Sequence, residues 1–256
     1  MDISGKVAIV TGGASGLGQA TVELYAEKGA SVAIFDLNEE AGKAIAERLG
    51  DNVVYYNVDV ADEASVQKAI DAVVEKFGAL HIVNNYAGIG PACKTLSGKG
   101  PHPIDLYVKI VMINQVGTFN VARLAAEKMA KNTPVNDDGV TGVIINTASV
   151  AAYEGQIGQV AYSATKGAVV GMTLPMAREL ASYGIRVNTI VPGLIHTPLF
   201  DTIEESYYKS LEASTVFPKR LGKTSEIAAL SLHIVENDYI NGECIRMDAG
   251  VRMQPK

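Results

Sequence analysis

Little cysteine, no excess of basic charge and no long apolar run mark this sequence, and each absence excludes a class of protein. The 256 residues include two cysteines, Cys93 and Cys244, which form no CxxC pair. A disulfide framework is therefore not expected, and a reducing compartment such as the cytoplasm fits. The formal net charge of −6 disfavours nucleic acid and anionic membrane surfaces as partners.

Signals for membranes, targeting and metals are also missing. No apolar run approaches the ~20 residues that a membrane-spanning helix needs. Residues 1–6 lead straight into a strand-like segment, so neither a signal peptide nor a transit peptide is expected. The four histidines show no metal-ligand spacing, so no metal site is expected. The sequence does contain 48% hydrophobic residues, enough for the core of one α/β domain spanning residues 1–256.

Short segments rich in Val and Ile alternate with longer segments of helical periodicity. Several of the short segments are apolar on both faces, as buried parallel strands are. This β–α–β order predicts a single-domain Rossmann fold, with a doubly wound, mostly parallel seven-stranded sheet and helices on both faces. The expected strands are 7–10, 31–36, 53–58, 80–85, 142–147, 186–191 and 243–247, and the expected helices include 19–28, 39–49, 63–77 and 160–183.

Two segments interrupt this alternation. Residues 88–103 are interpreted as an insertion loop and residues 194–219 as a substrate-binding loop with a short helix, because long loops in compact domains are usually lids or binding loops. Apolar residues in the second loop either line a pocket for an apolar substrate or pack the loop onto the domain. They are Leu199, Phe200, Tyr207, Tyr208, Leu211, Val216 and Phe217.

A glycine-rich turn, Thr11–Gly18, separates the first expected strand from the first expected helix. Glycines there permit a tight turn and a close approach of phosphate, and the free N–H groups at the helix start favour a pyrophosphate. A simple strand–helix turn would have a similar composition, but the position after the first strand favours a dinucleotide site. The predicted cofactor contacts are Gly12, Ser15, Gly16, Leu17 and Gly18.

Two aspartates follow the next two expected strands. Asp36 ends the second strand, where a carboxylate can accept the ribose hydroxyls of the adenosine and repel the 2′-phosphate of NADP. NAD is therefore the expected cofactor, although a solvated aspartate opening the next helix would give the same pattern. Asp59 ends the third strand and is predicted either to meet the adenine amino group or to serve as a turn residue.

Candidate catalytic side chains also cluster at strand ends. Tyr162 and Lys166 lie one helical turn apart on one face, and Ser149 follows the expected strand 142–147. Asn114 lies in the helix after the first long loop. Because ligands bind at the carboxyl ends of strands in such folds, the segment Asn85, Tyr86, Ala87, Gly88 is assigned to the cofactor. Taken singly, Ser149 also fits a turn cap and Asn114 a polar residue within a helix.

The glycine turn, the Asn–Ser–Tyr–Lys set and the Pro192-Gly193 pair together resemble the classical short-chain dehydrogenase/reductase family over essentially the whole chain. The resemblance implies that Tyr162 acts as general acid/base and that Ser149 binds the substrate oxygen. Lys166 and the positive nicotinamide ring of NAD⁺ are together expected to lower the pKa of Tyr162. Lys166 also binds the nicotinamide ribose by this resemblance, while Asn114 holds a water. Gln159 and Leu199 are assigned to the substrate, and further cofactor contacts to Val60, Pro192, Gly193, Ile195 and Thr197.

Longer matches are similar to the type II 3-hydroxyacyl-CoA dehydrogenases within that family, namely residues 145–156, 171–175, 192–194, 197–199 and 252–255. This similarity implies a role in lipid metabolism, a homotetramer and oxidation of a 3-hydroxyacyl-CoA to the 3-ketoacyl-CoA. Lys94, Lys99 and His102 would then meet CoA phosphates, although exposed loop lysines are usually only solubilising. The chain departs from the family at Tyr86, usually Asn, and at His81, often Asp, which is interpreted as surface variation.

Two alternative functions remain open. A secondary-alcohol or steroid dehydrogenase, or a 3-oxoacyl-acyl-carrier-protein reductase, would share the fold, but biosynthetic reductases usually use NADPH and Asp36 disfavours it. A non-catalytic nucleotide-binding scaffold is the other alternative. Such proteins often lack the Tyr or the Lys, whereas Tyr162 and Lys166 are both present here.

Overall fold

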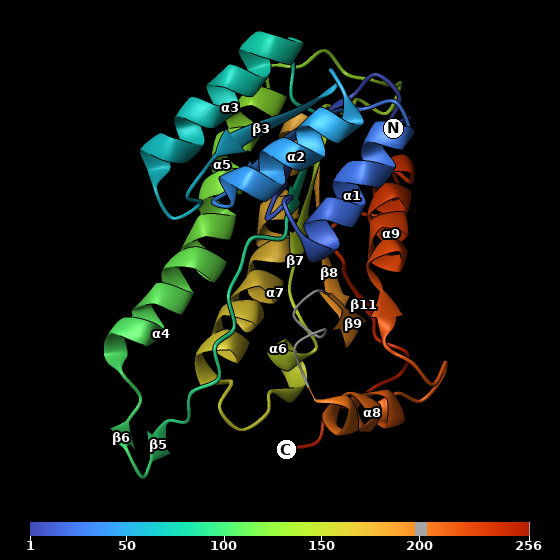
Figure 1. The fold of residues 1–256 in the computed structure, drawn as a ribbon. Coiled ribbons are helices and arrows are strands. Elements are labelled where there is room, and N and C mark those ends of the chain that lie inside the picture. The colour runs from blue at the N-terminus through green and yellow to red at the C-terminus, as the bar shows by residue number, and fades with distance from the viewer. Residues whose placement is uncertain (198–203, 256) are drawn as a thin grey trace.

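The computed structural model describes residues 1–197 and 204–255, without the side chain of Tyr207. Its centre is a seven-stranded sheet in the order β11-β8-β7-β4-β1-β2-β3, in which every neighbouring pair is parallel (Figure 1). The strands are β1 (Val7–Thr11), β2 (Ser31–Asp36), β3 (Val53–Asn57), β4 (Ile82–Asn85), β7 (Gly142–Thr147), β8 (Ile185–Pro192) and β11 (Cys244–Met247). The predicted Rossmann fold and its seven strands are confirmed, and the sheet is wholly parallel.

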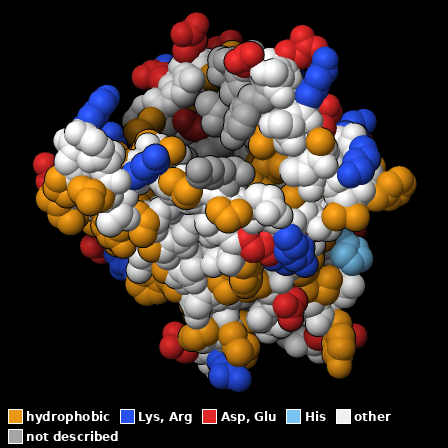
Figure 2. Space-filling view, turned by 90° about the horizontal axis from the view of Figure 1, so that it is seen from below, with side chains coloured by type: hydrophobic (Ala, Val, Ile, Leu, Met, Phe, Trp, Pro, Cys, Tyr) orange, Lys and Arg blue, Asp and Glu red, His pale blue; other side chains and the backbone are white. Residues whose placement is uncertain are grey.

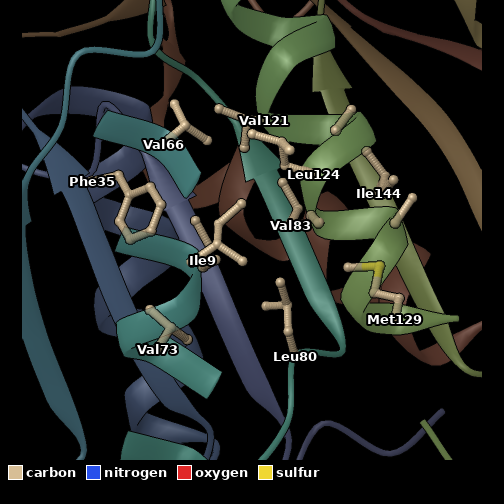
Figure 3. Packing of buried hydrophobic residues seen from close by; sticks show 14 of the residues in the cluster. Ile9, Phe35, Val66, Val73, Leu80, Val83, Val121, Leu124, Met129 and Ile144 are labelled. Carbon is tan, nitrogen blue, oxygen red and sulfur yellow. The ribbon is translucent and has the colours of Figure 1, made fainter. Parts of the chain in front are cut away.

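Helices cover both faces of this sheet. One face carries α3 (Glu63–Phe77), α5 (Gly117–Met129) and α7 (Val160–Leu180), and the other carries α1 (Gly16–Glu27), α2 (Glu39–Leu49) and α9 (Thr224–Glu236). Side chains of β1 alternate between the two cores, because successive residues of a strand face opposite ways. Val7 and Ile9 enter the first core, and Ala8 and Val10 enter the second. Figure 3 shows Ile9 and Phe35 meeting Val66 and Val121 in the first core.

Local sequence explains where these helices begin. Asn38 precedes α2 and its side chain accepts a hydrogen bond from Ala41 N. Asp62 precedes α3 and accepts from Ala64 N and Ser65 N. Both bonds satisfy amide groups that the first turn of a helix leaves unpaired. Among the described residues, no helix is both long and apolar enough to cross a bilayer.

The two predicted loops contain short elements of their own. The first holds a hairpin of β5 (Leu96–Ser97) and β6 (Gly100–Pro101), and α4 (Ile104–Val111) follows it. The second holds β9 (Ile195–His196) and the expected helix, α8 (Glu205–Ser214), after which β10 (Gly222–Lys223) pairs with β9. The hairpin and α8 lie at the same end of the molecule in Figure 1. Seen from that end, hydrophobic side chains border a hollow (Figure 2).

The strand order indicates where a ligand would bind. The chain proceeds from β1 to β2 and β3 on one side and then returns to β4, which pairs with the other edge of β1. In an open parallel sheet such a reversal leaves a crevice at the carboxyl ends of the two central strands. Thr11 and Asn85 end these two strands.

Candidate active site

The glycine-rich turn passes directly over the end of β4. Gly12 has φ +65°, and a Cβ on it would lie 3.0 Å from Ala87 N. A Cβ on Gly18 would lie 2.1 Å from Gly12 O, so only glycine permits this packing of α1. α1 begins at Gly16, and Leu17 lines the neighbouring cavity. The backbone therefore leaves room for a phosphate against the first turn of α1.

Asp36 lies beside this turn. Its Oδ2 accepts a hydrogen bond from Ala14 N at 3.0 Å, and its Oδ1 accepts from Asn38 N at 2.9 Å. The carboxylate is thus anchored next to the start of α1, where the adenosine ribose of a dinucleotide would lie. Asp59 is exposed and its Oδ1 accepts from Ala61 N, which is the bond of a turn residue. Val60 is buried, and its carbonyl accepts from Asn120 Nδ2.

The end of β4 and the segment after it lie beside the cavity. Asn85 is buried and donates from Nδ2 to Asn146 Oδ1 at 3.0 Å. Tyr86 borders the cavity, but its hydroxyl bonds to Thr21 Oγ1 at 3.0 Å and to Ser231 Oγ at 2.6 Å. The hydroxyl therefore joins α1 to α9. Both side chains are thus already hydrogen-bonded within the protein.

Gly88 lies beside two other predicted site residues, Asn114 and Lys166. A Cβ on Gly88 would lie 3.2 Å from Asn114 Oδ1 and 3.7 Å from Lys166 Nζ. Glycine at this position thus lets the chain pass between the Asn114 amide and the Lys166 ammonium group. Gly90 has a similar role, because its Cβ would lie 3.1 Å from the ring of Tyr162.

Asn114 lies in a π-helical segment, η1 (Met112–Val116), between α4 and α5. Its side chain is fully buried, with Nδ2 donating to Ile89 O at 2.8 Å and to Thr165 Oγ1 at 3.2 Å. Its Oδ1 accepts from Ile89 N at 2.8 Å. Asn114 therefore clamps the backbone after β4 against α7, the helix that carries Tyr162 and Lys166. Single π-helical turns often mark functional sites.

Burial sets the charge state of the Tyr162–Lys166 pair. Lys166 Nζ lies 5.7 Å from the centre of the Tyr162 ring and donates to Thr147 O at 2.7 Å. Burial lowers the pKa of Lys166 to about 8. Burial also raises the pKa of Tyr162, and a hydrogen bond with Ser149 only partly opposes it. Among the protein groups, desolvation of the phenolate outweighs this hydrogen bond, so the acidification of Tyr162 by Lys166 and NAD⁺ together stays a prediction.

Ser149 lines the cavity beside Tyr162. It bonds to Tyr162 and also accepts from Ala151 N at 3.1 Å, which is the bond of a turn cap, and its catalytic role stays a prediction. The cavity measures about 490 Å³. Of the predicted residues, the cavity lining includes Leu17, Tyr86, Gly88, Ser149, Gln159, Tyr162, Lys166, Pro192, Gly193, Ile195, Thr197 and Leu211.

The substrate loop contributes less than expected. Leu211 of α8 lines the cavity, but Val216 and Phe217 are 63% and 81% exposed and point into solvent. The Phe217 amide, with that of Val216, bonds to Ala249 O, which holds this part of the loop against the end of the chain. The predicted substrate residue Leu199, together with Phe200, lies outside the described residues.

A second, open depression of about 760 Å³ adjoins the cavity and shares Ala151 and Gln156 with it. Lys94 lines this depression, whereas Lys99 and His102 do not. His102 bonds through Nδ1 to Pro103 O at 2.8 Å. Of the three basic residues assigned to CoA phosphates, Lys94 alone therefore lies beside a hollow large enough to take a ligand.

Several lining residues escaped sequence reasoning. Ile89, Thr147 and Leu194 follow or end strands, so the strand-end rule alone could have found them. Met253 carried no such signal, because it is brought to the cavity from the far end of the chain. Within residues 1–197 and 204–255, no group of three His, Cys, Asp or Glu side chains could hold a metal ion.

The arrangement suits proton transfer beside a bound dinucleotide. A phenol and a serine hydroxyl share one cavity with a buried ammonium group, and the glycine turn opens next to them. Such a site can donate a proton to an oxygen while Ser149 stabilises the charge that develops there.

Known proteins match this chain along its whole length. A family model described as short chain dehydrogenase matches residues 6–207. The 3-hydroxyacyl-CoA dehydrogenase type-2 of Drosophila melanogaster is 50% identical over 255 residues, which is 99% of this chain and 100% of the relative. The Homo sapiens protein of that name is 49% identical, covering 99% and 97% of the two chains. A crystal structure of 3-hydroxyacyl-CoA dehydrogenase type-2 from Mycobacterium avium superposes with a TM-score of 0.94 at 42% identity, covering 98% of each chain.

Proposed function

The chain belongs to the short-chain dehydrogenase family, and on this premise we propose that it is an NAD-dependent enzyme that interconverts a 3-hydroxyacyl-CoA and a 3-ketoacyl-CoA. Membership makes it an oxidoreductase that uses a nicotinamide cofactor. The observation that carries the proposal is the meeting of Ser149, Tyr162 and Lys166 in one cavity below the glycine turn. The names of relatives with half of their residues in common support the substrate class.

The residues present fit a dinucleotide. The turn at Gly12 and Gly18 has no room for side chains, and the start of α1 faces the crevice. The Asp36 carboxylate supports NAD over NADP, because it would repel a 2′-phosphate. Leu17, Pro192 and Thr197 would border the cofactor from both sides of the crevice.

The proposed chemistry divides between cofactor and protein. A bound nicotinamide supplies hydride transfer at the carbon that bears the oxygen. Tyr162 holds the proton: its raised pKa keeps the phenol protonated at neutral pH, so it serves directly as a general acid in ketone reduction. In alcohol oxidation the phenol must release that proton, which nearby positive charge favours. Lys166, with a pKa of about 8, is mostly charged at pH 7 and lies within reach.

We propose that Ser149 orients the substrate oxygen and that Asn114 acts indirectly. Ser149 can donate to the oxygen where charge develops, while its backbone neighbour holds it in place. Both ends of the Asn114 amide are engaged by Ile89 and Thr165. Asn114 therefore positions α7 and the segment that follows β4. A water bound at Asn114 would have to share the amide group with Ile89 and Thr165.

The cavity and the depression together support an acyl-CoA. The acyl group would occupy the 490 Å³ cavity beside Leu211, and the CoA arm would leave through the depression that Lys94 lines. A role in lipid metabolism follows from that substrate. The acidic, cysteine-poor composition supports a cytoplasmic location.

We also propose a homotetramer. Exposed apolar side chains form a stripe along α4, η1 and α5, because they recur every three or four residues. They are Ile104, Val108, Met112, Val116 and Phe119, which are 38–70% exposed. Contiguous exposed apolar surface of this kind marks interaction sites.

The substrate class is tested by comparing acetoacetyl-CoA with a plain ketone of similar chain length, each with NADH. A preference of at least about tenfold in kcat/KM for the thioester is expected, equivalent to about 1.4 kcal/mol. Equal turnover of both substrates would contradict the CoA assignment. The Tyr162→Phe variant is the control for chemistry: it should lose turnover and keep NADH binding, measured by fluorescence. Wild-type turnover in that variant would contradict the role of Tyr162.

A further inference from the structure

The last residues of the chain cross the segment that joins the catalytic serine to α7. After β11 the chain turns at residues 248–250 and continues as residues 251–255, here called the C-terminal strap. The strap lies against residues 154–157, between α6 (Ala151–Glu154) and α7. Three hydrogen bonds join the two segments: Met253 N to Glu154 Oε2 at 3.1 Å, Gln156 Nε2 to Gln254 O at 3.0 Å, and Ile157 N to Pro255 O at 3.0 Å.

A cluster of four charges anchors the strap. Arg246, on β11, donates to Glu154 at 2.9 and 3.3 Å and to Asp248 at 2.8 and 2.6 Å. Arg252 completes the cluster at 3.3 Å from Glu154 and 3.2 Å from Asp248. The side chains of Arg246, Glu154 and Asp248 are only 24%, 19% and 9% exposed. These paired, largely buried contacts are stronger than surface ion pairs.

The strap delivers one side chain to the active site. Met253 lines the 490 Å³ cavity together with Ser149 and Tyr162. It also packs on an apolar cluster formed by Ala148, Val150, Val169 and Val191. Methionine is flexible and unbranched, so it follows the shape of an apolar ligand.

The strap also holds the polar wall of the cavity. Gln156 donates to the strap, and its backbone N donates to Gln159 Oε1 at 2.9 Å. Both glutamines line the cavity. The strap that carries Met253 is therefore linked to the two glutamines by hydrogen bonds, through the carbonyl of the adjacent Gln254.

We propose that Met253 is a specificity-determining residue that limits the size of the acyl group, and that Arg246 and Glu154 are positioning residues that hold it in the cavity. This inference rests on the proposed function, because it assigns part of the same site to the acyl chain. A smaller residue at 253 opens the cavity to longer chains, and a larger one restricts it to the shortest.

The test measures kcat/KM with NADH for 3-ketoacyl-CoA substrates from four to twelve carbons. Met253→Ala should raise the ratio of long-chain to short-chain kcat/KM about tenfold, a change typical of pocket enlargement, and Met253→Phe should lower it. Met172→Ala is the matched control. Met172 packs on the same apolar cluster but does not line the cavity, so the ratio should stay as in the wild type. An unchanged ratio in both Met253 variants overturns the proposal.

The positioning role is tested in the same assay. Arg246→Met should weaken the preference for short acyl chains. Adding Met253→Ala to Arg246→Met should change this preference little further. Arg246→Lys, which keeps the positive charge, should retain part of the wild-type preference. Additive effects of Arg246→Met and Met253→Ala would exclude the coupling. A parallel series of plain methyl ketones separates this inference from the proposed function. If no thioester reacts, the proposed substrate class is contradicted, and the methyl ketones still test the role of Met253. If the thioesters react but the ratio of long-chain to short-chain kcat/KM does not change in the Met253 variants, only the inference about Met253 is contradicted.

Discussion

At the scale of single residues, one carboxylate is placed to select the dinucleotide. Asp36 is bound on both oxygens, to Ala14 N and to Asn38 N. These bonds hold its charge beside the start of α1 instead of leaving it to move in solvent. A 2′-phosphate would therefore meet a fixed negative charge at this point.

Replacing this carboxylate should relax the choice between cofactors. In Asp36→Ser, we expect the ratio of kcat/KM for NAD⁺ to that for NADP⁺ to fall at least about tenfold, because a repulsion worth about 1.4 kcal/mol or more is removed. Steady-state kinetics with both cofactors measures the ratio. Asp51→Ser removes the same charge from an exposed loop and is the control. A ratio that falls equally in both variants would show that only net charge matters.

The pKa of Tyr162 depends on its burial in the folded protein as well as on its neighbour Lys166. The Tyr–Lys spacing suggested a phenol made acidic by its neighbour, yet burial raises the pKa of Tyr162. Burial lowers the pKa of Lys166 to about 8, so the ammonium group is still mostly charged at pH 7, and it donates to Thr147 O. The protein groups alone therefore favour the protonated phenol.

At the scale of elements, a histidine lies where β1 and β4 begin. His81 was interpreted as surface variation, but its Nδ1 accepts a hydrogen bond from Val7 N at 3.2 Å. Burial, and then the charge of Lys6, lower the pKa of His81 to about 4. The side chain is therefore neutral at pH 7 and contributes to the start of the sheet.

This histidine should make stability depend on pH. An unfolded histidine titrates near ~6.5, so between pH 6.5 and 4 the unfolded chain binds more protons than the folded one. The stabilisation is complete above pH 6.5 and is lost as the pH falls towards 4. We expect urea unfolding at pH 7 and pH 5 to show a larger fall in the wild type than in His81→Asn, by about 1 kcal/mol after allowing for solvent screening.

The asparagine retains an acceptor for Val7 N without titrating, which makes His81→Asn the appropriate variant. His233→Asn is the matched control, since His233 is exposed on α9. If the wild type and His81→Asn lost the same stability between the two pH values, His81 would not be the titrating group.

At the scale of the whole molecule, the exposed stripe on α4, η1 and α5 is left uncovered by the domain itself. Its side chains lie along one helical face beside α7, which also exposes Val160 and Leu174. A neighbouring subunit would bury this surface, and the gain of about 25 cal/mol per Å² of apolar area favours association.

Charges placed on the stripe should therefore dissociate the assembly. For the wild type, sedimentation should give four times the chain mass of 27.0 kDa. In the double variant Val108→Lys with Phe119→Lys, we expect smaller species, because buried unpaired charges are costly. Leu37→Lys is the control, since Leu37 is an exposed apolar residue outside the stripe. A wild-type protein that sediments as a single chain would refute the tetramer.

Much of the site was predictable because its signals are local. The glycine turn needs neighbouring glycines, and Tyr162 and Lys166 need one helical turn between them. Strand ends share an edge in any parallel sheet, which located Ser149 and Gly88. The sequence left open whether Val216 and Phe217 line a pocket or pack the loop, and both are largely exposed, because hydrophobicity alone does not tell whether a loop residue faces a pocket or solvent.

Period and spacing in the sequence by themselves determined the α/β class, the seven strands and the Tyr162–Lys166 pair, since these depend on residues close together in the chain, and the resemblance to a known family added Asn114 and Ser149. Only the tertiary structure decided that Met253 reaches the cavity, that Asn114 clamps Ile89 to α7, and that the phenol of Tyr162 resists ionisation. Those properties depend on contacts between distant segments and on how much water each group loses on folding, and neither is encoded in any short stretch of residues.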